Sequence, residues 1–179
     1  MQISVHNKTL DLSTPQVMGI LNVTPDSVYA GSRKQTEQEI AERTNQIILE
    51  GGKIIDVGAF STGPGSADVS EEEELLRMRN GLAIVRREQP DALVSIDTFR
   101  PSVARMAVEE FGADIINDIS EGRGYYNNTS NENAKVDVDA NENEPSDILL
   151  EVARLQVPYI LMSLQADLEN TVSVFLKKI

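Results

Sequence analysis

Cysteine is absent from this 179-residue chain, histidine occurs once, and no long apolar run is present. The lack of cysteine excludes a disulfide framework and thiol chemistry. His6 is the only histidine and falls in a predicted N-terminal strand, so a mechanism that needs a histidine base is poorly supplied. No run approaches the roughly 18 apolar residues that cross a bilayer, and the N-terminus lacks signal-peptide regions. We therefore expect a soluble cytoplasmic protein with no membrane partner.

Basic residues are few relative to acidic ones. The chain has 16 Lys and Arg against 29 Asp and Glu, which gives a formal net charge of −13. Such a surface repels phosphate backbones, so nucleic acid is not an expected partner. An anionic substrate would need a local cluster of backbone N–H groups, basic side chains or a metal. Neither a Walker A run nor a dinucleotide-binding fingerprint is present.

Apolar strands alternate with amphipathic helices along the chain, and the length predicts one domain over residues 1–179. The pairs Thr36/Glu39 and Ser70/Glu73 have the spacing of capping boxes. The predicted strands span 2–5, 8–12, 17–22, 53–58, 92–97, 113–119 and 157–162, and the predicted helices span 36–50, 70–88, 101–110, 146–155 and 166–178.

The first two strands predict a hairpin, and the other elements repeat a β-α unit about five times. This order indicates a parallel α/β sheet with right-handed crossovers. A TIM-type barrel and an open doubly wound sheet both agree with it, but a full eight-unit barrel takes roughly 250 residues. Residues 121–145 are rich in Asn, Glu and Asp and nearly free of aliphatic residues. We expect them to form a flexible polar loop.

Short polar residues lie at or near the ends of four consecutive predicted strands. They are Asn22, Asp56, Asp97 and Asn117. The carboxyl ends of parallel strands meet at one rim, where α/β folds place their ligand sites. Either aspartate could instead cap a helix or accept from nearby backbone amides. Four such residues in succession favour a shared binding site.

Four motifs surround these positions: MGILNVTPDS at 18–27, DVGAFSTGPGS at 56–66, SIDT at 95–98 and INDIS at 116–120. In these motifs the chain resembles the dihydropteroate synthases, the pterin-binding enzymes of folate synthesis. The resemblance covers residues 17–120 closely and 146–162 moderately. It implies a TIM-barrel type fold of parallel β/α units, incomplete with about five of eight units, behind an N-terminal β-hairpin.

The resemblance also implies roles for individual residues. Asp97 and Asn117 would grip the pterin ring, with Asp56 and Thr62 in the same pterin and diphosphate site, and Asn22 would contribute to binding Mg²⁺ and diphosphate. The implied reaction joins 6-hydroxymethyl-7,8-dihydropterin diphosphate to p-aminobenzoate by displacing diphosphate from a methylene carbon. No protein nucleophile is required, and no catalytic residue is assigned.

The chain departs from the family pattern at several points. Gly63 stands where the family has arginine, Phe60 where it often has glutamate, and Ser163 and Leu164 follow Met162 in place of a Met-His run. A second pterin-binding aspartate, a lysine and an Arg-His pair have no counterpart. The chain could be a fragment of an enzyme, a catalytically inactive homologue, or an interaction protein. In the last case a homo-oligomer or a partner would close the exposed sheet edges.

Overall fold

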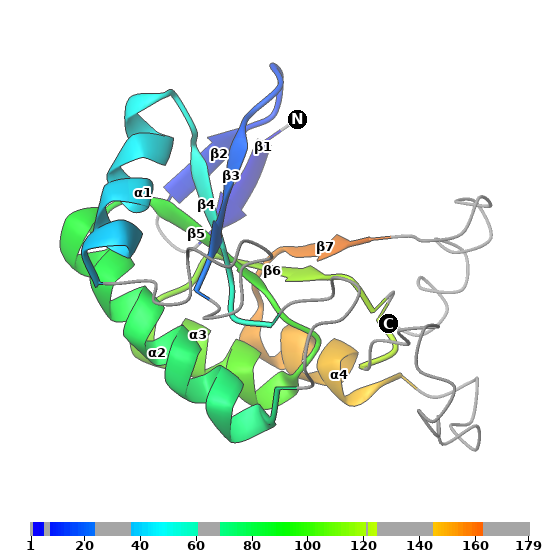
Figure 1. The fold of residues 1–179 in the computed structure, drawn as a ribbon. Coiled ribbons are helices and arrows are strands. Elements are labelled where there is room, and N and C mark those ends of the chain that lie inside the picture. The colour runs from blue at the N-terminus through cyan, green and yellow to red at the C-terminus, as the bar shows by residue number, and fades with distance from the viewer. Residues whose placement is uncertain are drawn as a thin grey trace.

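The computed structural model describes residues 2–5, 8–23, 37–60, 69–120, 122–124 and 145–162. A parallel sheet of five strands, in the order β3-β4-β5-β6-β7, lies beside an antiparallel hairpin of β1 and β2 (Figure 1). The strands are β1 (Gln2–Val5), β2 (Lys8–Asp11), β3 (Met18–Asn22), β4 (Ile54–Gly58), β5 (Leu93–Asp97), β6 (Ile115–Asp118) and β7 (Tyr159–Leu161). The helices are α1 (Glu37–Leu49), α2 (Glu71–Glu88), α3 (Pro101–Phe111) and α4 (Asp147–Leu155). The predicted hairpin and parallel sheet are confirmed.

The four helices connect consecutive strands and follow one another around one side of the sheet (Figure 1). Helix α1 packs against α2, α2 against α3, and α3 against α4. This arrangement follows from right-handed crossovers between neighbouring parallel strands, each of which places its helix on the same side. The helices therefore cover one face of the sheet, and the ends of the strands are free to carry polar groups.

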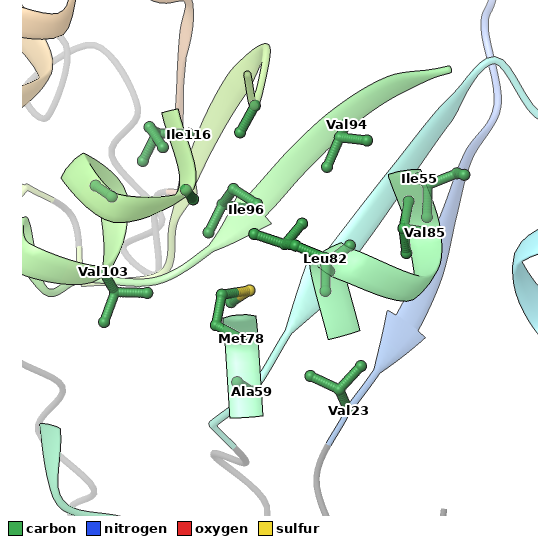
Figure 2. Close-up of a cluster of buried hydrophobic side chains, with 14 of the residues drawn as sticks. Val23, Ile55, Ala59, Met78, Leu82, Val85, Val94, Ile96, Val103 and Ile116 are labelled. Atoms are coloured by element: carbon green, nitrogen blue, oxygen red, sulfur yellow. The ribbon is translucent and has the colours of Figure 1, made fainter. Parts of the chain in front are cut away.

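The main hydrophobic core fills the space between the sheet and the helices (Figure 2). Ile55, Ile96 and Ile116 project from three neighbouring strands toward Met78 and Leu82 of α2, and all five are completely buried. Each such side chain contributes roughly 1.5–3 kcal/mol through its removal from water. The spacing of Met78 and Leu82 places both on one face of α2, which explains why this helix sits over the middle of the sheet.

A second, smaller core lies on the opposite face of the sheet at the N-terminal ends of the strands. Leu10 of the hairpin packs with Ile54, Leu93 and Ile115. Side chains alternate between the two faces along a strand. On each of these strands, the residues two and four positions after the apolar one therefore lie on the same face, closer to the carboxyl end. One face of the sheet therefore has an apolar floor, covered by the hairpin, and a polar rim above it.

Local signals explain where the helices begin and end. Ser70 caps α2, and its Oγ accepts from the backbone N–H of Glu73 at 3.2 Å. The capping box is only half formed, because the Glu73 carboxylate pairs at 2.7 Å with Arg77, a charged donor one turn further along. Pro101 opens α3, and Gly112 closes it in the left-handed conformation with φ of 61°.

Several predicted features lie outside the described residues. These are the Thr36 cap, the helix at 166–178, His6, Thr62 and most of the polar loop at 121–145. Among the helices that the structure describes, none combines the length and the apolar composition that spanning a bilayer requires.

Candidate functional site

Four residues form one row across the carboxyl end of the sheet. Asn22 is paired in register with Gly58, Gly58 with Asp97, and Asp97 with Asn117. Register partners in a parallel sheet project from the same face, here the one opposite the helices. Of the five site residues predicted from the sequence, the structure thus places Asn22, Asp97 and Asn117 in this row. Asp56 lies two residues before Gly58 on the same face, and Thr62 is not among the described residues.

Gly58 leaves the centre of the row open. A Cβ atom at this position would lie 3.2 Å from Oδ1 of Asn22 and 3.5 Å from Oδ2 of Asp97. Oxygen atoms from β3 and β5 therefore approach the same point above β4. A side chain at residue 58 would occupy the space between them, which gives a physical reason for glycine at the end of this strand.

Asp97 is the most perturbed carboxylic acid of the row. Its side chain is partly buried, and no described residue donates a hydrogen bond to its carboxylate. Burial, together with the negative charges of Asp56, Glu74 and Asp118, raises the pKa of Asp97 to about 7. A carboxylate without donors in such surroundings gains from a ligand that brings N–H groups to it.

Asn117 and Asp56 are joined by a hydrogen bond below the row. Nδ2 of Asn117 donates to Oδ2 of Asp56 at 3.1 Å, and both side chains are buried. Burial raises the pKa of Asp56, and the neighbouring Ser95 and Asn117 oppose the rise. Ser95 is the register partner of Asp56 on the neighbouring strand. Among the described residues, Oδ1 of Asp56 and Oγ of Ser95 have no hydrogen-bond partner.

Asn22 is exposed at the end of the edge strand β3. Its amide oxygen and the Asp97 carboxylate are the hard oxygen donors that Mg²⁺ prefers. Within the described part of the chain, no group of three or more His, Cys, Asp or Glu residues could hold a metal ion. Asn22 and Asp97 are therefore the oxygen donors that the row itself offers to a cation.

A second cluster supports the segment that follows Asp97, and sequence reasoning missed it. The Arg100 guanidinium lies 5.5 Å from the Phe60 ring and 5.2 Å from the Phe99 ring, and it forms an ion pair with Glu74. Thr98 Oγ1 donates to the same carboxylate at 2.8 Å. Phe60, which replaces the glutamate frequent in the resembled family, thus belongs to an aromatic and cationic cluster.

Glu74 is the last of four glutamates at the start of α2, yet its side chain is fully buried. It falls one turn before Met78, on the helix face that packs against the sheet. A charged residue at a core position of a helix requires a buried partner. That periodicity was the signal in the sequence from which a partner such as Arg100 could have been expected.

Asp118 anchors the segment after β6 from the opposite face. Its carboxylate accepts from the backbone N–H groups of Ser120 at 2.6 Å and Gly122 at 3.1 Å, and from the hydroxyl of Tyr159. Burial and the neighbouring Asp118 charge raise the pKa of Tyr159, which keeps its hydroxyl protonated as a donor. The chain leaving the row at Asn117 is therefore held firmly in place.

Comparison with known proteins identifies similar chains. The family model described as "Pterin binding enzyme" matches residues 18–174. Dihydropteroate synthase of Escherichia coli strain K12 is 43% identical over 119 residues, which cover 66% of this chain and 42% of that protein. The Yersinia pestis dihydropteroate synthase, in a crystal structure with a sulfonamide drug complex, superposes with a TM-score of 0.73 and 29% identity over 99% of this chain and 60% of that one.

A Xanthomonas albilineans dihydropteroate synthase in complex with 7,8-dihydropteroate superposes with a TM-score of 0.68 and 27% identity, over 100% of this chain and 62% of that one. These structural similarities confirm the predicted class, an incomplete barrel of parallel β/α units behind a hairpin. The chain spans between 22% and 42% of the length of the curated relatives compared with it. This partial coverage agrees with the partial match to the family that the motifs predicted.

Proposed function

Because the chain belongs to the pterin-binding enzyme family, we propose that it binds a dihydropterin at the polar row and contributes this half of the site to a dihydropteroate synthase. The reaction would join 6-hydroxymethyl-7,8-dihydropterin diphosphate to p-aminobenzoate in folate biosynthesis. The amine nitrogen forms a bond to the methylene carbon while the bond from that carbon to the diphosphate oxygen breaks. The protein would accelerate the reaction by positioning the two substrates and stabilising the developing charge, without a protein nucleophile.

The observation that supports this function best is the carboxylate of Asp97. A pterin presents a 2-amino group and a ring N–H side by side, and one carboxylate can accept from both. Asp97 lies in partly buried surroundings that raise its pKa, with no donor from the described residues. Donors from a ligand would stabilise the ionised form. A ligand without them would leave the carboxylate unpaired, which gives selectivity.

Asn117 and Asn22 flank this carboxylate in the row. Asn117 would contact the same heterocycle through its amide, with Asp56 behind it. Asn22 would hold Mg²⁺ with the diphosphate, and Thr62 would contact the pterin diphosphate. When bound, the ion would supply positive charge to the departing diphosphate. The exposure of Asn22 at the strand end supports this placement.

The test is isothermal titration with the dihydropterin diphosphate in the presence of Mg²⁺. Asp97→Ala is expected to weaken binding at least ~100-fold, because it removes two charge-assisted hydrogen bonds worth about 1.5–3 kcal/mol each. Asp91→Ala removes an exposed carboxylate before β5 and is the matched control, with unchanged affinity expected. No heat of binding to the unaltered chain, or equal affinity for both variants, would contradict the proposal.

A second candidate function is assembly, and the exposed edge strands favour it. Within the described residues β3 pairs only with β4 and β7 only with β6. Ile20 on β3 is 60% exposed, and Ile160 on β7 is 37% exposed. Edges of this kind pair readily with another chain. We expect a homo-oligomer in light scattering after size-exclusion chromatography, and a monomer at all concentrations would remove this candidate.

A further inference from the structure

The hydrogen bond between Asn117 and Asp56 fixes the orientation of the asparagine side-chain amide. The two residues lie on β4 and β6, with β5 between them, and their side chains meet at 3.1 Å from Nδ2 to Oδ2. An ionised carboxylate is only an acceptor. If the amide turned over, its oxygen would face a carboxylate oxygen at hydrogen-bond distance, an arrangement that repels. The amide oxygen of Asn117 therefore points away from Asp56.

Asp56 lies one layer below the row that contains Asn117. Its register partner is Ser95, so it belongs to the layer of side chains between the apolar floor and the row that contains Gly58 and Asp97. Exposure does not separate the two partners, because Asp56 is 5% exposed and Asn117 is 7% exposed. The distinction is one of layer, since Asn117 lies in the row beside Asp97 and Asp56 lies below it. No hydrogen bond to Oδ1 of Asn117 is formed within the described residues, so this oxygen remains available as an acceptor.

We infer that Asp56 is a positioning residue, which turns the Asn117 carboxamide so that its oxygen acts with the Asp97 carboxylate on one ligand. This inference rests on the proposed pterin site and refines it. Asp97 and Asn117 are register partners, so the site offers two neighbouring acceptors along one edge. Such an edge selects a heterocycle that carries N–H groups and rejects one that presents oxygen or bare nitrogen acceptors there.

A double-mutant cycle with pteroic acid as the probe separates positioning from direct contact. Asp56→Ala and Asn117→Ala are each expected to weaken binding about 10-fold, the effect of one hydrogen bond of about 1.4 kcal/mol. If Asp56 acts through Asn117, adding Asp56→Ala to Asn117→Ala changes the affinity by less than about 2-fold. If the two losses multiply, Asp56 contacts the ligand itself and the inference is overturned.

Two further variants sharpen the cycle. Asp56→Asn keeps an acceptor for Asn117 and is expected to retain binding within about 3-fold, because its amide can turn to present oxygen. Thr44→Ala alters a buried hydroxyl without a partner on α1, away from the row, so it is the matched control and should leave affinity unchanged. Circular dichroism checks the fold of each variant, and the nearly isosteric Asp56→Leu replaces Asp56→Ala if the latter does not fold.

A readout without ligand keeps the inference independent of the proposed function. In ¹⁵N NMR spectra, one side-chain Hδ2 proton of Asn117 should exchange slowly in the unaltered chain and in Asp56→Asn, and rapidly in Asp56→Ala. Equal exchange in all three would overturn the inference. Failure of the unaltered chain to bind pteroic acid would instead remove the proposed function, and the NMR result would still decide whether Asp56 orients Asn117.

Discussion

The acidic residues at the two ends of the sheet differ in how many hydrogen-bond donors surround them. At the N-terminal end, Asp114 accepts from the backbone N–H of Val94 at 2.9 Å and from Arg86 at 3.3 Å, and Lys8 lies 3.7 Å from the same oxygen. At the carboxyl end, Asp97 receives no hydrogen bond from a described residue. Asp97 ends strand β5, and Asp114 accepts from Val94 of the same strand.

This difference separates a structural end from the end where we propose that the ligand binds. Asp114 and the hairpin residue Leu10 close the bottom of the sheet with matched charges and apolar packing. Asp97 keeps its acceptors unmatched, although this lowers the stability of the folded chain. Acidic residues with perturbed pKa values and no partner within the protein are typical of ligand-binding sites. Identical substitutions at the two ends should therefore have opposite effects.

The largest effect is expected from Asp114→Asn. The change removes the negative charge that faces Arg86 and Lys8. Unpairing buried charged groups should lower the free energy of unfolding by about 2–4 kcal/mol. Urea unfolding followed by circular dichroism measures it, with exposed Asp91→Asn as the control. A change no larger than the control would erase the contrast between the two ends.

Asp97→Asn should stabilise the chain. The pKa of this carboxyl is about 7 in the folded state, against an ordinary 3.8, so the folded state binds the proton more tightly than the unfolded state does. Its contribution to stability is therefore greatest below about pH 4 and is lost as the pH rises through 7. At pH 8 the neutral amide should raise the free energy of unfolding by about 1–3 kcal/mol, after allowance for partial exposure.

The gain from Asp97→Asn should shrink at pH 5, where the unaltered carboxyl is protonated in the folded state. Thermal unfolding at the two pH values measures the difference. A variant that is less stable than the unaltered chain at pH 8 would show that Asp97 has internal partners after all, and the contrast with Asp114 would fail.

The smallest effect is expected at Glu151, on the helical layer. Hydrogen bonds from Arg105 and Arg154 lower its pKa to about 2 from an ordinary 4.5. It contributes stability above pH 4.5, and the contribution is lost as the pH falls toward 2. Both arginines are half-exposed, so Glu151→Gln should cost only about 1 kcal/mol at pH 7. The deficit should close at pH 2, and one that persists there would point to lost packing.

The sequence predicted the fold to within a few residues because strands that are apolar throughout and end in a polar residue are a local signal. Asn22, Asp97 and Asn117 could be placed at one rim on that basis, since parallel strands share their direction. The hydrogen bond from Asn117 to Asp56 could not be predicted, because it joins residues that are 61 positions apart in the chain. It depends on how side chains turn across an intervening strand.

The pairing of Glu74 with Arg100 shows the same limit of local patterns. The run of four glutamates at the start of α2 reads as a solvated helix terminus. Only the packing of α2 on the sheet shows that the fourth one is buried. The half-formed capping box at Ser70 has a similar cause, because Arg77 offers Glu73 a stronger partner than the backbone.

The most direct test is a ¹³C NMR titration of the Asp97 side-chain carboxyl with and without pteroic acid. We expect the free chain to titrate near 7 and the bound chain to titrate well below this value, because ligand N–H groups stabilise the carboxylate. A carboxyl that titrates near 3.8 in the free chain, or one whose pKa does not move when the ligand is added, would contradict the assignment of this row as a pterin site.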